Sequence, residues 1–106
     1  MITINYYIGL KDKDTKDYKY SRDRMINTIL DVLKDYYEGF TLQECKGCYT
    51  HHTDIDDDVI IEDSIKVTVF TTVGQSHIEE VCEELKEALN QECIAVEVRR
   101  SCISFI

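Results

Sequence analysis

The sequence predicts an α+β fold of the ferredoxin-like β-α-β-β-α-β type, with a four-stranded antiparallel sheet and two helices on one face. Apolar residues alternate with polar ones in separate segments near the start, middle and end of the chain, which is typical of strands with one buried face. Two other segments have apolar residues at helical spacing and separate these strands. The connection between the two middle strands is too short for a crossover, so they are expected to form a hairpin. At 106 residues, the chain is expected to be one domain, 1–106.

The first strand and the first helix are expected over residues 2–10 and 22–37. The strand has apolar side chains at every second position: Ile2, Ile4, Tyr6, Ile8 and Leu10. After a charged loop, Ser21 is a suitable N-cap. An apolar stripe then runs from Met25 to Tyr37, and Gly39 stands just past it, where helices commonly end. This predicts a helix of about four to five turns.

The middle hairpin is expected over residues 40–70. Its first strand, over 40–49, contains Lys46-Gly47, which suggests a bulge. A polar, acidic turn follows over 51–58. The second strand alternates again, with Ile65, Val67 and Val69 on the apolar side.

The second helix and the last strand complete the pattern. Ser76 and Glu79 have the spacing of a capping box, and Asn90 is expected to end the helix in a left-handed conformation. The buried stripe of this helix is Ile78, Val81, Cys82, Leu85 and Leu89. The last strand alternates over 94–98, and Arg99-Arg100 disturbs the alternation, which suggests a bulge or a second short strand. The open face of the sheet is expected to carry Thr3, Asn5, Tyr7, Lys66, Thr68, Phe70, Glu97 and Arg99.

Three short segments resemble a family of small proteins from phages and mobile elements of low-GC Gram-positive bacteria. They are Tyr7-Ile8-Gly9-Leu10-Lys11-Asp12-Lys13-Asp14-Thr15, Gly47-Cys48-Tyr49-Thr50-His51 and Leu85-Lys86-Glu87-Ala88-Leu89-Asn90-Gln91-Glu92. The family has no catalytic residues to carry over, and this chain departs from it by adding Cys45, Cys48 and His52. The resemblance implies a mobile-element origin and an accessory role. By analogy of size and charge, the chain is also similar to anti-CRISPR inhibitors.

The chain is acidic, and its charge is unevenly distributed. It has 21 acidic and 12 basic residues, a formal net charge of -9. Residues 11–24 have six bases and four acids, a net of +2, so the remainder carries -11. This balance argues against direct nucleic-acid binding, which needs a basic surface.

Two acidic clusters account for most of the surplus, one around the hairpin turn and one on the second helix. Their members are Asp54, Asp56, Asp57, Asp58, Glu62, Asp63, Glu79, Glu80, Glu83, Glu84 and Glu87. One interpretation is a solvated surface that keeps the protein soluble. The other is a partner-binding surface that docks on the basic, nucleic-acid-binding groove of a host defence protein.

A Cys-His segment suggests a second hypothesis, a zinc-binding module. Cys45 and Cys48 have the C-x-x-C spacing of a zinc knuckle, and His51 or His52 is a candidate third ligand. The fourth ligand would come from Cys93, Cys82 or an aspartate of 54–58. Since no second Cys or His pair follows, the other interpretation is a strand with incidental cysteines, which leaves the protein without a cofactor.

The sequence predicts no enzymatic activity. No G-x-S-x-G, H-E-x-x-H or glycine-rich phosphate loop is present, and His77 is expected to be solvated at the start of a helix. The function predicted is therefore a small, acidic, non-enzymatic binding or inhibitor protein. Since five cysteines cannot all pair within one chain, and no leader or membrane-spanning run is evident, a cytoplasmic location without membrane contact is expected. A third hypothesis is a self-associating structural protein, a homodimer formed through the open sheet face.

Overall fold

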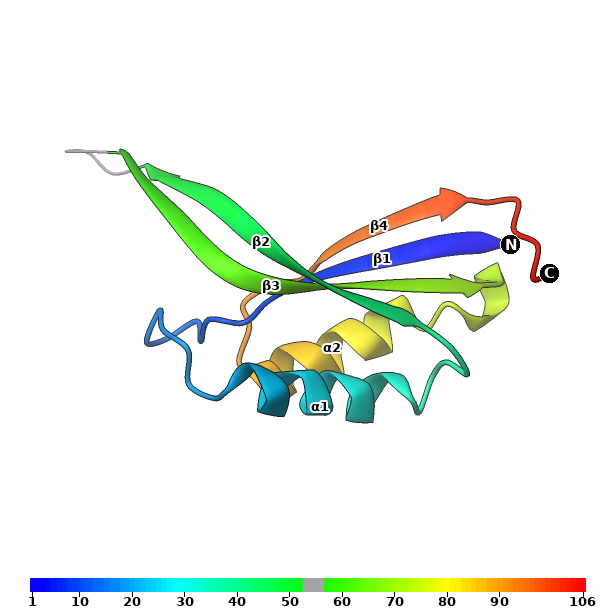
Figure 1. Cartoon of the computed structure of the whole chain (residues 1–106), viewed down its shortest axis with the longest axis horizontal. Coiled ribbons are helices and arrows are strands. Elements are labelled where there is room, and N and C mark those ends of the chain that lie inside the picture. Colours follow the sequence, from blue (N-terminus) through cyan, green and yellow to red (C-terminus); the bar gives the residue numbers. More distant parts are fainter. Residues whose placement is uncertain (53–56) are drawn as a thin grey trace.

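The computed structural model describes residues 1–52 and 57–106 and contains the predicted β-α-β-β-α-β order. The elements are β1 (Ile2–Gly9), α1 (Arg22–Leu33), β2 (Thr41–His52), β3 (Asp57–Thr71), the 3₁₀ turn η1 (Val73–Gln75), α2 (Ile78–Leu89) and β4 (Ala95–Arg100). The sheet order is β2-β3-β1-β4, and every neighbouring pair is antiparallel. Both helices lie on one face of the sheet (Figure 1). The predicted fold class is therefore confirmed.

The hydrophobic core lies between the sheet and the helices. In β1, the alternation of apolar and polar residues determines which of its side chains face this core. Its buried apolar residues are Ile2, Ile4, Tyr6, Ile8, Leu10, Met25, Ile29, Leu33, Tyr37, Ile65, Val67, Val69, Val81, Leu85 and Leu89. Each strand and helix in this set contributes the positions that its period places on one face. Burying one such aliphatic or aromatic side chain contributes roughly 1.5–3 kcal/mol.

Two buried tyrosines form a hydrogen-bond chain through this core. The hydroxyl of Tyr37 donates to the carbonyl of Ser76. Because that uses the only proton of Tyr37, the hydroxyl of Tyr6 donates to the oxygen of Tyr37 over 2.5 Å. Burial, and then the bond to Tyr37, raises the pKa of Tyr6, so it stays a neutral donor. This hydrogen-bond chain joins β1, one of the two inner strands of the sheet, to the turn that follows α1 and to the segment that precedes α2.

The open face carries the residues predicted for it, and a polar cluster covers its centre. Asn5 donates to Glu97 over 2.9 Å and accepts from Thr68 over 2.7 Å, and it is only 2% exposed. In the β1–β3 register, Tyr7 is opposite Lys66 and Thr3 is opposite Phe70. Tyr7 is four residues away from Thr3 along β1. Tyr7 and Phe70 are therefore not side by side.

The middle hairpin and the last strand are more regular than predicted. The β2–β3 register is continuous from Thr41↔Thr68 to His52↔Asp57, without a bulge at Lys46. The β1–β4 register is also continuous as far as Arg100, and the residues after it do not form a second strand. The predicted bulges at Lys46-Gly47 and at Arg99-Arg100 are therefore wrong, since neither strand pair contains an extra residue.

The helix ends also differ from the prediction, for a reason that involves the tyrosine chain. The predicted N-cap Ser21 is confirmed, since its hydroxyl accepts the N–H of Arg24. However, α1 ends at Leu33, and a turn brings Tyr37 into the core. At α2, Ser76 uses its carbonyl for Tyr37, and the N-cap is His77, whose side chain makes no capping bond. The predicted left-handed end at Asn90 is confirmed, with φ 50°.

The β2–β3 hairpin extends beyond the rest of the sheet and forms an arm. Pairing between β1 and β3 stops at Gly9↔Ser64, whereas β3 begins at Asp57. The arm, defined here as residues 45–52 and 57–63, projects past both helices (Figure 1). It contributes to a molecule that measures 52 Å along its long axis and 26 and 24 Å along the others.

Replacing Tyr37 by Phe is expected to lower stability. The change leaves the Ser76 carbonyl without its donor and the Tyr6 hydroxyl without its acceptor, which is expected to cost about 1–3 kcal/mol. Urea unfolding of Tyr37→Phe and of the control Tyr20→Phe, whose ring is partly exposed at 37%, measures the difference. Equal unfolding midpoints for the two variants would contradict a stabilising role for the chain.

Candidate functional site

An aromatic pocket lies at the end of the sheet opposite the arm. Its volume is about 840 Å³, and it lies where α1 has just ended, β2 begins, β3 ends and α2 is about to begin. The residues that line it are Met1, Tyr36, Tyr37, Glu38, Gly39, Phe40, Thr41, Thr68, Val69, Phe70, Thr71, Thr72, Gln75, His77 and Phe105. This size and this mixture of rings with a few polar groups are typical of sites for small molecules.

Tyr36 and His77 form one wall of the aromatic pocket. Their ring centroids are 5.5 Å apart, and the hydroxyl of Tyr36 donates to Glu84 over 2.7 Å. The hydrogen bond to this carboxylate is the main reason that the pKa of Tyr36 rises to about 12. At neutral pH Tyr36 is therefore protonated, and it presents a ring and a held hydroxyl, not a base.

The backbone of His77 is in the left-handed region, with φ 50°. This conformation is uncommon for residues other than Gly, although Asn, Asp and His adopt it more often than the rest. His77 lies between η1 and α2, and this backbone conformation places its imidazole beside Tyr36. The prediction that His77 is merely solvated is incomplete, because this side chain also lines the aromatic pocket.

The far side of the aromatic pocket brings the sheet and the C-terminal segment together. Phe70, at the end of β3, packs edge-on against Phe105 with 6.3 Å between ring centroids. The Thr3 hydroxyl is hydrogen-bonded to that of Ser101, which holds the start of this segment against β1. Among the lining residues, Glu38 is the charged side chain and no Lys or Arg is present. The aromatic pocket is therefore suited to an aromatic or cationic ligand.

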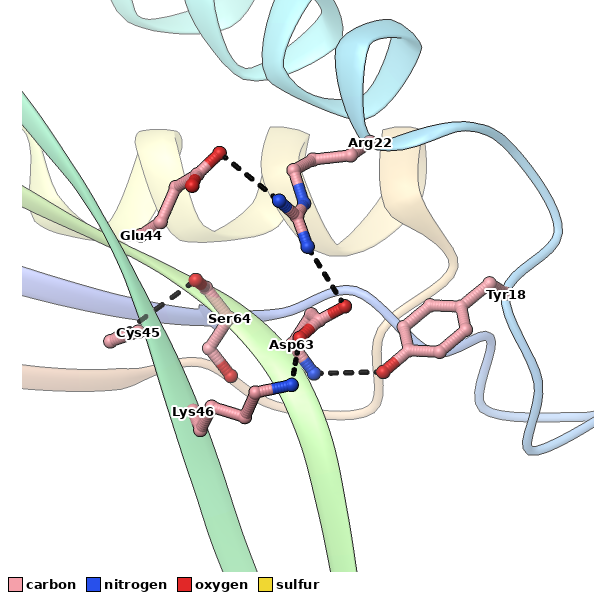
Figure 2. A network of polar contacts seen from close by, with 7 residues as sticks. All are labelled: Tyr18, Arg22, Glu44, Cys45, Lys46, Asp63 and Ser64. Atoms are coloured by element: carbon pink, nitrogen blue, oxygen red, sulfur yellow. Dashed lines mark hydrogen bonds and ion pairs between the residues drawn. The ribbon is translucent and has the colours of Figure 1, made fainter.

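A polar network holds the root of the arm (Figure 2). Asp63 accepts from Lys46 over 2.7 Å and from Arg22 over 3.2 Å, and Arg22 also contacts Glu44 at 3.5 Å. The backbone N–H of Asp63 donates to the Tyr18 hydroxyl over 2.8 Å. The hydrogen bond from Lys46, followed by that from Arg22, lowers the pKa of Asp63. This network anchors the loop over 11–20 and the start of α1 to the hairpin.

The first acidic cluster is only partly free for a partner. Glu62 accepts the N–H of Lys11 over 3.0 Å and lies so close to Gly9 that a Cβ there would collide with it. Asp63 belongs to the arm-root network. Asp54 and Asp56 lie outside the described residues, and Asp57 and Asp58 are described by their backbone alone.

The second acidic cluster lies on the solvent-exposed side of α2. Glu79, Glu80, Glu83, Glu84 and Glu87 are all exposed. Two of them have internal partners, since Glu83 pairs with Lys86 at 2.9 Å and Glu84 holds Tyr36. The partner-binding role of either cluster stays a prediction.

The cysteines of the Cys-His segment lie on the unbroken strand β2. Side chains three positions apart on a strand point to opposite faces, so Cys45 and Cys48 do not converge. Cys45 is half-buried, and its thiol donates to the Ser64 carbonyl over 3.6 Å, while Cys48 is exposed. The side chains of His51 and His52 are outside what the structure describes.

Within the described residues, no group of three His, Cys, Asp or Glu side chains is placed to hold a metal ion. Zinc binding stays a prediction. In the same part of the chain, no helix is both long enough and apolar enough to span a membrane.

The comparisons with known proteins identify the fold. Neither the family models nor the curated proteins searched gave a match. Among solved structures, a phage SAM lyase in complex with S-methyl-5'-thioadenosine has a TM-score of 0.66 at 18% identity, over 92% of this chain and 79% of that chain. The apo state of a phage SAM lyase has a TM-score of 0.67 at 16% identity, over 92% and 78% of the two chains.

A third solved structure is the periplasmic divalent cation tolerance protein CutA from Archaeoglobus fulgidus. Its TM-score is 0.55 at 11% identity, over 99% of this chain and 88% of that chain. At these identities, the likeness establishes a shared ferredoxin-like fold and nothing more specific.

The comparisons contradict the prediction that the chain is not an enzyme. The fold that it shares with the phage SAM lyase is the fold of an enzyme. The prediction depended on the absence of hydrolase, metalloprotease and phosphate-binding motifs, which are signatures of other enzyme classes. Their absence says nothing about an enzyme whose site is made of rings and scattered polar groups.

Sequence reasoning did not identify the aromatic pocket, because its residues are dispersed along the chain. Tyr36, Phe70, His77 and Phe105 come from four different segments. The pair Tyr36-Tyr37 was a usable signal, since one ring of such a pair is expected at the edge of the core.

Replacing Glu84 by Gln is expected to lower the pKa of Tyr36 towards its ordinary value near 10. The neutral amide no longer favours the protonated phenol over the phenolate. Tyrosine ring chemical shifts, followed by NMR between neutral and alkaline pH, measure the change. The control is Glu83→Gln at the adjacent position, which is also exposed and pairs with Lys86 instead of Tyr36. An unchanged Tyr36 titration in Glu84→Gln would contradict the proposed contact.

Proposed function

We propose that this chain is a small phage-type enzyme that binds S-adenosylmethionine in the aromatic pocket and converts it to S-methyl-5'-thioadenosine. In this reaction the bond between the sulfonium sulfur and the amino-acid chain breaks, and the sulfur keeps the electron pair. The substrate's own carboxylate forms the new bond to the carbon that loses sulfur, so the amino-acid part leaves as a lactone and no further reactant is consumed. The observation that carries the proposal is the composition of the pocket lining, which has several aromatic rings and one carboxylate and, among the described residues, no Lys or Arg. The likeness to a phage SAM lyase over 92% of this chain supports it. A phage or mobile-element origin and a cytoplasmic location belong to the same proposal.

The ligand has two groups that match this lining. Its adenine is a flat aromatic ring, which Tyr36, Phe70 or Phe105 can stack against. Its sulfonium is a permanent cation, and contact with an aromatic face contributes about 0.5–2 kcal/mol. Glu38 and the surplus of acids in the whole chain favour a positively charged ligand further.

The polar residues of the aromatic pocket have distinct proposed roles. Tyr36 is held by Glu84, so it positions the ligand through its ring and does not act as a base at neutral pH. His77 supplies an imidazole that can donate a hydrogen bond to the ligand or accept one from it. Its left-handed backbone is consistent with a functional position, since such conformations persist where the surroundings enforce them.

Calorimetry with S-adenosylmethionine and S-adenosylhomocysteine tests the binding. The two ligands differ by one methyl group and the positive charge, so the first is expected to bind up to about tenfold more tightly. Tyr36→Ala is expected to weaken binding about tenfold, while Tyr20→Ala, on a tyrosine outside the pocket, leaves it unchanged. No binding of either ligand would overturn the proposal.

Chromatography of S-adenosylmethionine incubated with the protein tests the reaction. The expected result is time-dependent formation of S-methyl-5'-thioadenosine above the uncatalysed rate. His77→Asn is the informative variant, because Asn tolerates the left-handed backbone and removes only the imidazole. Product formation that is unaffected by His77→Asn would remove His77 from the proposed role.

We propose as a second candidate function that the acidic surface of α2 docks on the basic groove of a host protein. The observation that favours it is the exposure of Glu79, Glu80 and Glu87, with no ion pair to another described residue. Such a surface mimics the charge of a nucleic acid and would inhibit a defence protein, as anti-CRISPR inhibitors do. This surface lies outside the aromatic pocket lining, so the two functions are compatible.

Capture of partners from a host lysate tests this second candidate. Binding is expected to weaken when salt rises from low concentration to about 0.5 M, because exposed charges are then screened. Glu80→Lys with Glu87→Lys is expected to abolish capture. The control is Asp31→Lys with Asp35→Lys, which changes the net charge equally next to the other helix. The candidate function would be overturned if the same partner is still captured at about 0.5 M salt and is also captured by the Glu80→Lys, Glu87→Lys variant.

A further inference from the structure

The arm has a strand edge without a neighbouring strand in the described chain. The Leu10 N–H donates to the Asp63 carbonyl over 3.1 Å, and the Asp63 N–H donates to Tyr18, so the backbone groups of Asp63 face away from β2. Successive residues of an antiparallel strand direct their backbone groups to alternate edges. Those of Ile61 and Val59 therefore face the same edge, beyond the point where β1 ends.

The same stretch of the arm exposes three consecutive aliphatic side chains. Val59 is 65% exposed, Ile60 39% and Ile61 54%. Natural edge strands usually carry charges or a proline that discourage further pairing. In β3 the charges flank the aliphatic stretch, with Asp57 and Asp58 before it and Glu62 and Asp63 after it. An apolar stretch bordered by acids on a projecting hairpin is suited to pairing with a strand that presents apolar and basic side chains.

A complementary edge is present on β4, at the opposite border of the sheet. The Ser101 N–H donates to the Met1 carbonyl over 3.1 Å, so by the same alternation the backbone groups of Arg100 and Val98 face outward. Val98 is 49% exposed. The charges are also complementary, since residues 47–65 contain six acids and no Lys or Arg, whereas β4 ends in Arg99 and Arg100. Arg99 pairs with Glu97 of the same strand at 3.6 Å, so Arg100 supplies the net positive charge of this edge.

We propose that the arm of one copy pairs through its free β3 edge, at Val59–Ile61, with the free β4 edge of a second copy of this chain. Aliphatic contacts between Val59 or Ile61 and Val98 are joined by attraction between the acidic arm and the arginines. Because the two edges differ, each copy offers an arm and receives one, and the assembly closes as a reciprocal dimer or a ring. The interface is distinct from the open sheet face.

The arm-root network supports this role. Asp63, Arg22, Lys46 and Tyr18 hold the base of the hairpin to the body, so the projecting part is pre-oriented (Figure 2). Pre-orientation lowers the entropic cost of ordering a segment when it binds.

Sedimentation equilibrium over a concentration series tests the proposal. The wild-type chain is expected to be an oligomer at micromolar concentration. Val59→Lys with Ile61→Lys, and separately Val98→Lys, are expected to raise the dissociation constant at least tenfold. The matched control is Val73→Lys, at an aliphatic side chain that is 74% exposed in η1, away from both edges. Circular dichroism verifies that each variant is folded.

Amide hydrogen exchange distinguishes strand pairing from other contacts. The amides of Val59, Ile61, Val98 and Arg100 are expected to exchange slowly in the oligomer and rapidly in Val98→Lys. A wild-type chain that is monomeric at hundreds of micromolar would overturn the proposal. So would an oligomer in which these four amides exchange rapidly, or one that Val73→Lys dissociates as strongly as the edge variants.

Discussion

The hydrogen-bond chain from Tyr6 through Tyr37 to the carbonyl of Ser76 joins three parts of the molecule that are distant in sequence. Tyr6 belongs to the central strand, Tyr37 to the turn after α1, and Ser76 to the step before α2. Because a buried hydroxyl without a partner is costly, this chain restricts where α1 ends and where α2 begins. The aromatic pocket is enclosed by the end of α1, the start of α2, the first residues of β2 and the last residues of β3. The candidate site therefore depends on this core interaction, and one of its members, Tyr37, also lines the aromatic pocket.

The acidic charge acquires different meanings at different places in the structure. Asp63 and Glu62 are internal to the arm root, where they hold a loop and a helix start. Glu84 orients Tyr36, so one member of the α2 cluster contributes to the aromatic pocket. The remaining carboxylates of α2 face solvent. The acidic residues that make up the net charge therefore have three roles. Some are structural, Glu84 supports the candidate site, and the others are available to a partner.

The two ends of the molecule are specialised in different ways. At one end, rings and an acid surround a hollow that suits a small cationic ligand. At the other end, the hairpin projects past β1 with an apolar edge. The sheet connects the two, since β3 runs from the arm to the aromatic pocket without interruption. Residues between these regions, such as Asn5 with its bonds to Thr68 and Glu97, fill the centre of the open face.

The amino-acid sequence by itself determined the fold class and much of the core. The alternation from Ile2 to Ile8 and the stripe from Val81 to Leu89 are local patterns, and the period of each element decides its buried face. The caps at Ser21 and Asn90 were predictable for the same reason, because capping uses neighbouring residues. Tertiary structure decided what depends on contacts between distant residues. It ended α1 early so that Tyr37 reaches Tyr6, moved the cap of α2 to His77, and placed His77 beside Tyr36. It also assembled the aromatic pocket and left the outer β3 edge of the arm without a neighbouring strand among the described residues. Both features follow from where elements end relative to one another in space.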